Sequence, residues 1–227
     1  MLKILITGST GAIGKKLTTH IPDFMGIDRR NGHDLLTCDL PDADIVYHLA
    51  AQTSVEESWI DPVLDSYNFN MMVRLVKRYP DAKIIYAQSG ASLEASSPYG
   101  FSKKICGDYL KKFHDNYVIT VFPNIFGTGR SVVDFFKAND EVNIYGDGSS
   151  VRDYVHVDDI VQGLLQAKSW PVGEYMMGSE KGVSVLELAE GKFVNFQPAR
   201  KEMKESILKN TTPDWKPTIN VMDYIHG

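Results

Sequence analysis

The sequence predicts an α/β protein with a parallel, doubly wound sheet covered by helices on both faces. Short apolar segments alternate with amphipathic segments through the first half of the chain, an order typical of repeated β-α units. Apolar residues form 43% of the 227 residues and charged residues 23%, as in ordinary globular proteins. A chain of this length holds one sizeable domain with a lobe, or two small domains.

The regular pattern is confined to the first half of the chain. Strands are predicted at 2–7, 23–28, 43–50, 83–89 and 117–122, and helices at 11–20, 61–79 and 98–114. Beyond residue 125, short helices near 131–138 and 157–168 mix with small strands near 142–145 and 173–177. This change predicts a core at 1–124 and a small lobe at 125–227, from which some segments return to the core.

One connection in the core is too short for a complete β-α unit. Only Pro41 and Asp42 separate the apolar segment DLLTCDL (34–40) from the next strand. A parallel crossover takes a dozen or more residues. The edge strand near 35–38 is therefore expected to be short, absent or joined in an unusual way.

A glycine-rich turn, TGSTGAIG, lies between the first strand and the first helix. Glycines at this place permit a tight turn, close approach of the backbone to a pyrophosphate and close packing of the helix on the strand. Free N–H groups at the start of the helix attract the phosphates. The pattern predicts a Rossmann-type dinucleotide-binding core. Its expected contact residues are Gly8, Thr10, Gly11, Ala12, Ile13 and Gly14.

An acidic residue ends the second predicted strand. Asp28 stands twenty residues after Gly8, where a carboxylate accepts the ribose hydroxyls of NAD and repels the extra phosphate of NADP. Arg29 and Arg30 follow it, and arginine is the residue that a 2′-phosphate attracts. The carboxylate favours NAD, while the two arginines keep NADP as the alternative.

A tyrosine and a lysine share one face of a predicted helix in SPYGFSKK. Tyr99 and Lys103 are four residues apart, Pro98 suits the first helical position, and Ser96 or Ser97 can cap it. This spacing also arises by chance at the polar start of a surface helix. The pair alone therefore does not establish a catalytic function.

Several motifs together carry a family resemblance. They are TGSTGAIG, HLAAQTSV (48–55), SPYGFSK (97–103), PNIFGTG (123–129), IYGDGSSVRDYVHVDDI (144–160) and GEYMMGSEKGVSVLELA (173–189). With these motifs the chain resembles the extended short-chain dehydrogenase/reductase family, specifically the NAD-dependent epimerase/dehydratase group that acts on nucleotide sugars. The resemblance covers nearly the whole length.

The resemblance implies an acid–base mechanism. Tyr99 would move the proton of a sugar hydroxyl, and Lys103 would hold the nicotinamide ribose and lower the pKa of the tyrosine. A nearby ammonium and the cationic nicotinamide both favour the phenolate. Ser89, at the end of the strand predicted at 83–89, would be the third partner, although relatives often carry two adjacent hydroxyl residues there and have a longer loop.

The resemblance also implies further binding residues. Besides the glycine turn, Asp28, Tyr99 and Lys103, the expected cofactor contacts are Asp39, Leu40, Leu49, Ala50, Ala51 and Asn68. The expected contacts to the substrate diphosphate are Asn124, Arg152 and Arg200. Surface ion pairs are the alternative function of the two arginines, and an exposed helix face is the alternative place for Asn68.

The residues after Ser89 discriminate among activities. Sugar 4,6-dehydratases of the family carry an Asp–Glu pair there, whereas this chain has Gly90 and Ala91. The prediction is therefore a UDP-hexose 4-epimerase of the UDP-glucose/UDP-galactose type that works through a 4-keto sugar. A nucleotide-sugar reductase or dehydratase, or a non-catalytic NAD-binding sensor, remains the alternative.

Charge and composition bear on partners and location. The net charge of −5 argues against nucleic acid or anionic membrane as the main partner, and no apolar run reaches the roughly 18 residues of a membrane helix. Cys38 and Cys106 form no CxxC motif, and His48 and His156 have no second ligand at useful spacing, so no metal site is predicted. A cytoplasmic enzyme is expected. The resemblance implies a homodimer formed by helices 61–79 and 98–114.

Overall fold

The computed structural model describes residues 2–199 and 204–227 and divides into two compact units. The first unit comprises the chain up to residue 121 together with 164–175, and the second comprises 122–163 and 176–227. Residues 164–175 thus return to the first unit after the chain has entered the second. That one unit binds the cofactor and the other the substrate stays a prediction.

The first unit is built on a six-stranded sheet in the order β2-β1-β3-β4-β5-β9. Its strands are β1 (Ile4–Thr7), β2 (Met25–Ile27), β3 (Ile45–His48), β4 (Lys83–Ser89), β5 (Tyr117–Phe122) and β9 (Gly173–Met176). The pairings β1–β2, β1–β3 and β3–β4 are parallel. Leu5, Val46 and Ile84 are fully buried, as expected for strands that helices cover on both faces.

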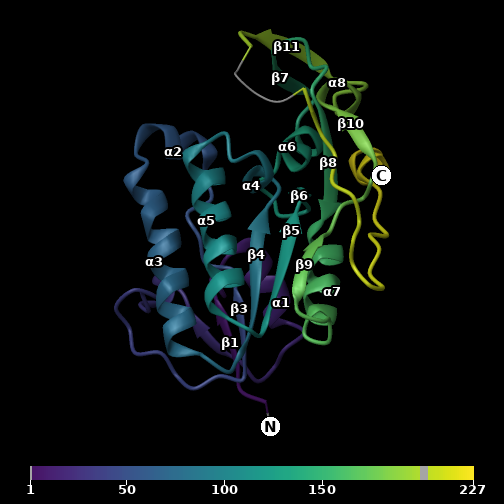
Figure 1. The fold of residues 1–227 in the computed structure, drawn as a ribbon. Coiled ribbons are helices and arrows are strands. Elements are labelled where there is room, and N and C mark those ends of the chain that lie inside the picture. Colours follow the sequence, from purple (N-terminus) through teal and green to yellow (C-terminus); the bar gives the residue numbers. More distant parts are fainter. Residues whose placement is uncertain (1, 200–203) are drawn as a thin grey trace. The chain divides into compact units, whose positions relative to one another are not determined.

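Helices cover both faces of this sheet (Figure 1). They are α1 (Ala12–Thr18), α2 (Val55–Ile60), α3 (Val63–Arg78), α4 (Ala91–Glu94) and α5 (Pro98–Phe113), with a 3-10 turn η1 (Arg29–Asn31) and with α7 (Val157–Ala167), which spans the two units. From β1 the chain proceeds to β2 in one direction, and from β3 to β4 and β5 in the other. Crossovers between parallel strands are right-handed as a rule, which places α1 on one face and α3 and α5 on the opposite face.

The segment between β2 and β3 contains no strand, so the edge strand near 35–38 is absent, one of the outcomes that the short connection predicted. All of residues 28–44 are described, and they form η1 and turns but no strand. Arginines of α3 hold this segment in place. Arg74 donates hydrogen bonds to the carbonyl of Cys38 at 2.5 Å, and Arg78 to that of Leu40 at 3.2 Å. These side chains satisfy backbone groups that a strand would have paired.

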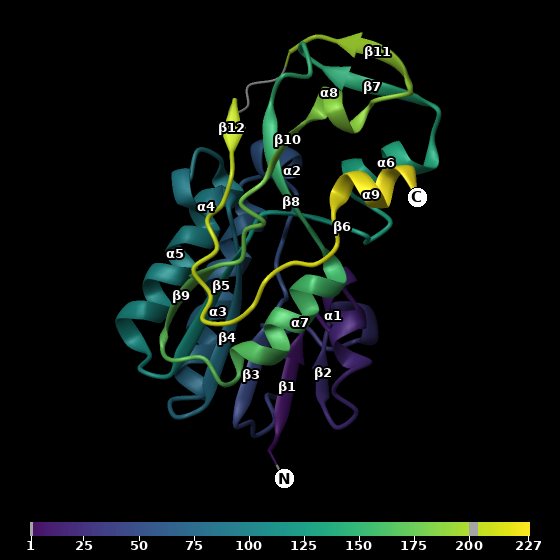
Figure 2. The same cartoon turned by 90° about the vertical axis from the view of Figure 1, so that its right-hand side faces the viewer.

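The second unit contains two small sheets (Figure 2). Its elements are β6 (Asn124–Phe126), α6 (Val132–Ala138), β7 (Glu141–Tyr145), β8 (Val151–His156), β10 (Gly182–Ser184), α8 (Val185–Leu188), β11 (Phe193–Gln197), β12 (Glu205–Ser206) and α9 (Val221–His226). β8 pairs with β6, β10 and β12, and β7 pairs with β11. Phe126, Phe136 and Tyr154 belong to the apolar core of this unit.

A buried carboxylate organises the loop that precedes α6. Asp134 accepts hydrogen bonds from the backbone of Gly127 at 2.9 Å and of Thr128 at 3.1 Å, and from the hydroxyls of Ser131 at 2.8 Å and Tyr224 at 3.1 Å. Burial raises the pKa of Asp134, but these hydrogen bonds outweigh it and lower the pKa to about 2. The loop therefore depends on an ionised side chain.

No helix within the described residues combines the length and the apolar character needed to cross a bilayer.

Candidate active site

The glycine turn lies directly against the chain that leaves β3. Gly8 has a φ of +72°, and a Cβ on it would lie 2.7 Å from the backbone nitrogen of Ala50. A Cβ on Gly14 would lie 2.2 Å from the carbonyl oxygen of Gly8. Gly11 is the N-cap residue of α1, and no side chain caps the helix there. The turn thus offers bare backbone to a ligand, and these residues fit a dinucleotide pyrophosphate.

Asp28 lies at the end of β2 and faces the same turn. Its carboxylate accepts hydrogen bonds from the backbone N–H of Thr10 at 3.2 Å and of Arg30 at 2.9 Å. Burial raises the pKa of Asp28, yet these bonds lower it overall below its ordinary value. The carboxylate is therefore ionised at neutral pH, as acceptance of ribose hydroxyls requires.

The residues after β3 are held by the end of β1. The amide of Leu49 donates to the carbonyl of Thr7 at 3.2 Å, and that of Ala50 to the Thr7 hydroxyl at 3.2 Å. The same hydroxyl lies 2.8 Å from Nδ1 of His48, whose pKa is lowered to about 3 by burial and by the charge of Lys103. His48 is thus a neutral residue, buried and hydrogen-bonded to the end of β1.

The remaining predicted cofactor contacts Asp39 and Leu40 lie in the segment without a strand between β2 and β3, and Ala51 follows Ala50 in the loop after β3. Their role toward the cofactor stays a prediction. The described residues contain no group of three or more His, Cys, Asp or Glu side chains placed to hold a metal ion.

Ser89 and Tyr99 are brought together at the carboxyl end of β4. Ser89 ends the strand, and its side chain forms a hydrogen bond with that of Tyr99, the second residue of α5. Ser97, rather than Ser96, caps α5 by accepting from the amide of Gly100 at 3.0 Å. α4 packs against this first turn, since a Cβ on Gly100 would lie 2.4 Å from the carbonyl of Ala91. The short loop after Ser89 thus still delivers Tyr99 to it.

Lys103 lies one turn further along α5 and is 4% exposed. Its ammonium donates to the carbonyl of Ala87 at 2.7 Å and lies 4.4 Å from the centre of the Tyr86 ring. Burial lowers its pKa to about 8. The lysine is therefore held inside the unit, at the strand that carries Ser89.

The acidity of Tyr99 differs from the expectation. Burial raises its pKa to about 12, the hydrogen bond from Ser89 lowers it, and the charges of Asp65 and Cys106 raise it further. Lys103 is not among the groups that shift the Tyr99 pKa here, and its ammonium donates to the Ala87 carbonyl. The lowering of the Tyr99 pKa by Lys103 beside bound cofactor stays a prediction. Burial deprives the phenolate of hydration, and the hydrogen bond from Ser89 compensates for only part of that loss.

Asn68 of α3 forms hydrogen bonds with the loop after β3 and with α5. Its side-chain oxygen accepts from the amide of Gln52 at 2.8 Å, and its nitrogen donates to the carbonyl of Gln52 at 3.2 Å and to the hydroxyl of Ser102 at 3.1 Å. It is 2% exposed, so the alternative of an exposed helix face is wrong. All three of its hydrogen bonds are to the protein. A direct contact with the cofactor stays a prediction.

Sequence reasoning missed Asp65 and Ser102, which complete this buried group. A signal was present, because Asp65, Asn68, Met72 and Leu75 are spaced by three or four residues and form the buried face of α3. Asp65 is 3% exposed, and burial raises its pKa. A polar residue at a buried helical position is the pattern to look for.

The predicted substrate residues belong to the second unit. Asn124 pairs with Tyr154 in the β6–β8 register, and Arg152 lies two residues before Tyr154, so the three share one face of the strand pair. Asn124 is exposed and donates to the carbonyl of Asp153 at 3.3 Å, and Arg152 is half-buried. Arg200 lies outside the described residues.

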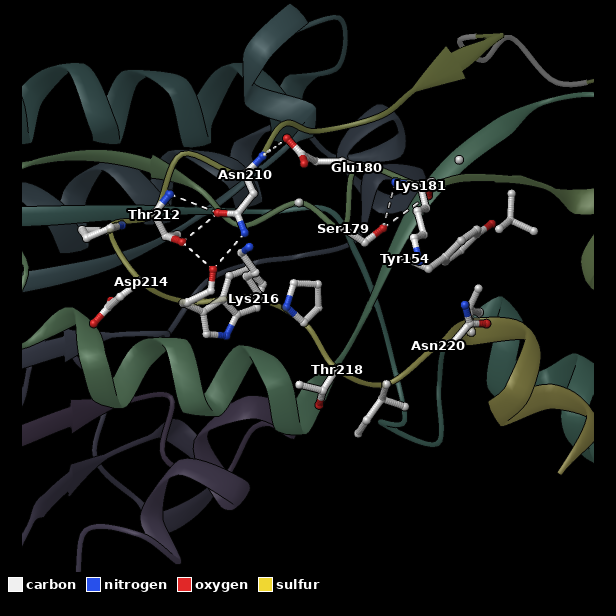
Figure 3. A pocket seen from close by; sticks show the side chains of 18 residues that line it. Tyr154, Ser179, Glu180, Lys181, Asn210, Thr212, Asp214, Lys216, Thr218 and Asn220 are labelled. Carbon is white, nitrogen blue, oxygen red and sulfur yellow. Dashed lines mark hydrogen bonds between the residues drawn. The ribbon is translucent and has the colours of Figure 1, made fainter.

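The second unit also contains a cavity of about 710 Å³ (Figure 3). It is lined by Tyr154 and by residues of 178–183 and 210–221, and neither Asn124 nor Arg152 is among them. In its wall the Thr212 hydroxyl donates to Asn210 at 2.7 Å, and Asn210 donates to the Trp215 carbonyl at 2.9 Å. These polar groups are therefore engaged with one another.

Comparisons with known proteins identify relatives of this chain. A protein of Methanocaldococcus jannaschii named "Putative UDP-glucose 4-epimerase" is 26% identical over 271 residues, which cover 99% of this chain and 87% of that one. The UDP-2-acetamido-2,6-beta-L-arabino-hexul-4-ose reductase of Pseudomonas aeruginosa is 23% identical over 222 residues, which cover 89% and 59%.

The fold is shared with solved enzymes. The UDP-glucose 4-epimerase of Thermotoga maritima, solved with UDP-glucose, superposes with a TM-score of 0.84 at 23% identity, covering 99% of this chain and 96% of that one. The Rossmann-type α/β prediction is thereby confirmed.

The family model described as NAD dependent epimerase/dehydratase matches residues 4–174, about three quarters of the chain. This match confirms the resemblance and the predicted cofactor, NAD. The chain belongs to the NAD-dependent epimerase/dehydratase family.

Proposed function

We propose that this protein is a UDP-hexose 4-epimerase that interconverts UDP-glucose and UDP-galactose or a closely related pair. The observation that carries the proposal is the buried Tyr99, hydrogen-bonded to Ser89 at the end of β4 and one turn from Lys103. In the same sheet, β3 alone separates β4 from β1, which leads into the glycine turn that fits a dinucleotide. The arrangement of Tyr99, Ser89 and Lys103 is suited to removing the proton of a hydroxyl group and returning it.

Tyr99 would take the proton of the C4 hydroxyl and later return it to the same oxygen. Bound NAD would supply hydride chemistry, accepting hydride from C4 and giving it back on the other face of the sugar. The C4–H and O–H bonds break as the carbonyl forms, and both form again with C4 inverted. The Ser89 hydroxyl would bridge the sugar oxygen and the phenol, which aligns the proton transfer.

The phenol needs help to act as a base, because its pKa in the protein alone is about 12. A positive charge close to the ring favours the phenolate. The nicotinamide cation would provide such a charge, and so would the Lys103 ammonium once ribose hydroxyls compete with the Ala87 carbonyl for it. Tyr99 would then be a competent base only beside the oxidised cofactor.

Gly90 and Ala91 argue against a 4,6-dehydratase, because neither can act as acid or base in removing water. A reductase is the second candidate, favoured by the Pseudomonas aeruginosa relative and by Arg30, whose guanidinium lies 3.5 Å from the Thr10 carbonyl beside the glycine turn. A 4-epimerase regenerates its cofactor in each cycle, whereas a reductase consumes a reduced one.

The nucleotide sugar would bind through Asn124 and Arg152, and the active form would be a homodimer built on α3 and α5. In support of the dimer, Phe113 is 61% exposed, and half-buried Tyr109 contacts Phe69 of α3 and Phe113 with ring centres 5.3 and 4.6 Å apart. Leu110 is fully buried and cannot contribute to such an interface. A monomer mass by light scattering would end this part of the proposal.

The test is an activity assay with purified protein, NAD and a panel of UDP-sugars, with products identified by NMR. A C4 epimer without net change in NADH is the expected result. Stoichiometric oxidation of NADH or NADPH with a 4-keto sugar would instead support the reductase. If no sugar is converted although NAD binds, a non-catalytic NAD-binding protein is the better description.

A further inference from the structure

A carboxylate lies buried in the first unit without the partners that such a group needs. Asp65 is 3% exposed on the inner face of α3. One of its oxygens lies 3.5 Å from the Ser102 hydroxyl, and among the described residues nothing donates a hydrogen bond to the other. The ion pairs of the described residues include none at Asp65. Such a group is costly to keep, which calls for a functional explanation.

Ser102 links this carboxylate to the first turn of α5. Its hydroxyl donates to the carbonyl of Tyr99 at 2.8 Å and accepts from Asn68 at 3.1 Å. A hydroxyl has one proton, and the Tyr99 carbonyl is much closer to it than Asp65 at 3.5 Å. The negative charge of Asp65 therefore remains largely unneutralised inside the protein. The Ser102 hydroxyl stands between this carboxylate and the backbone of Tyr99.

The other buried ionisable groups of α5, β4 and β3 do not carry a negative charge near neutral pH. Cys106 on α5 and Tyr86 on β4 have pKa values raised by burial, so both stay protonated. Lys103 on α5 is basic, and His48 on β3 is neutral because burial and the charge of Lys103 lower its pKa to about 3. Ser89 contributes an uncharged hydroxyl. Asp65 is the anion of this set.

We propose that Asp65 is a positioning residue of the active site, which acts by its charge on Tyr99 across the packed helices α3 and α5 and moves the active pH range of the enzyme upward. The proposal rests on the proposed function, because it assigns a role toward the tyrosine that moves the proton. A negative charge beside a phenol opposes its ionisation, and the low dielectric of the interior strengthens this effect.

The first experiment compares pH profiles of kcat/KM in the NAD-loaded enzyme for the parent, Asp65→Asn and Asp61→Asn. Asp61 is the matched control, since it carries the same charge just before α3 but is exposed. In Asp65→Asn the midpoint of the rise with pH should move down by roughly half a pH unit. In Asp61→Asn it should stay at the parent value. A folded Asp65→Asn enzyme with the parent midpoint overturns the proposal.

The second experiment does not depend on turnover. The phenolate absorbance of NAD-loaded protein is titrated, and the signal of Tyr99 is obtained by subtracting the titration of Tyr99→Phe. The same subtraction in the Asp65→Asn background should give a lower midpoint, and equal midpoints overturn the proposal. If Asp65→Asn does not fold, Asp65→Ser takes its place, with the same lower midpoint expected and an unchanged one again overturning the proposal.

The two experiments separate the two claims. A lower midpoint in the titration of a protein that converts no sugar supports the role of Asp65 and refutes the epimerase. If the protein epimerises the sugar and the midpoints of the parent and Asp65→Asn are equal, the epimerase is supported and the role of Asp65 is refuted.

Discussion

The two units use buried polar groups in different ways. In the first unit Tyr99, Lys103 and Asn68 are buried on regular helices, and their polar atoms converge on the end of β4 and the loop after β3. In the second unit the buried carboxylate of Asp134 holds a loop, whereas the predicted ligand residue Asn124 is exposed. The first unit thus buries the side chains that are expected to take part in the reaction. In the second unit the buried carboxylate holds a loop, and the side chain expected to bind the substrate is exposed.

The largest effect is expected from removing the phenolic oxygen in the first unit. Tyr99→Phe should reduce kcat about 10²–10⁴-fold, because the proton of the C4 hydroxyl loses its acceptor. Steady-state assays on the C4 epimers measure it. Tyr117→Phe, at the start of β5 and half-buried, is the control and should keep the parent rate. Equal rates for Tyr99→Phe and the parent would remove the basis of the proposed function.

Next in size is the loss of the cross-link beneath that site. Asn68→Ala should lower the free energy of unfolding by about 2–3 kcal/mol, because it removes three hydrogen bonds, two to the half-buried backbone of Gln52 and one to the buried Ser102 hydroxyl. Urea unfolding measures this change. Asn70→Ala is the control, since Asn70 is exposed on the same helix. A similar loss in both variants would mean that helix propensity, not the cross-link, is being measured.

A pH-dependent effect of about 2 kcal/mol is expected from Asp134 in the second unit. Its pKa is about 2 in the folded protein and near the ordinary 3.8 when unfolded, so the unfolded state binds the proton more tightly. The stabilisation is complete above about pH 4 and is lost as the pH falls toward 2. Urea unfolding between pH 2 and 7 should show a shallower acid dependence for Asp134→Asn than for the parent.

The control for this measurement is Asp140→Asn, whose carboxylate is fully exposed. It should retain the acid dependence of the parent. If Asp134→Asn retains it as well, the loop before α6 is not held by the ionised form.

The smallest effect on stability is expected at the exposed ligand residue of the second unit. Asn124→Ala should change the free energy of unfolding by less than about 0.5 kcal/mol, since it loses one hydrogen bond of 3.3 Å to a carbonyl. It should raise KM for the nucleotide sugar about fivefold, because the loss of one hydrogen bond weakens binding by about this factor. A loss of stability as large as that of Asn68→Ala would contradict the difference between the two units.

Much of the first unit could be predicted from its sequence. Apolar segments of four to seven residues mark β1, β3, β4 and β5, and Pro98 marks the start of α5. The absence of a strand between β2 and β3 followed from the length of that connection alone. In the second unit β6, β8, β10, β11 and β12 were not predicted. Each of these strands pairs with a segment distant in sequence, and no local pattern shows that pairing.

Among the candidate site residues, the sequence determined the family motifs, the glycine turn and the Tyr99–Lys103 pair, because their spacing along one strand or one helix fixes the shared face. The tertiary structure alone decided that Lys103 binds the Ala87 carbonyl, that Asn68 clamps Gln52, and that Asp65 lies buried near Tyr99. Hydrogen-bond partners and the direction of a pKa depend on burial and on charges from distant segments. Local spacing does not encode these quantities, which appear only when the helices pack.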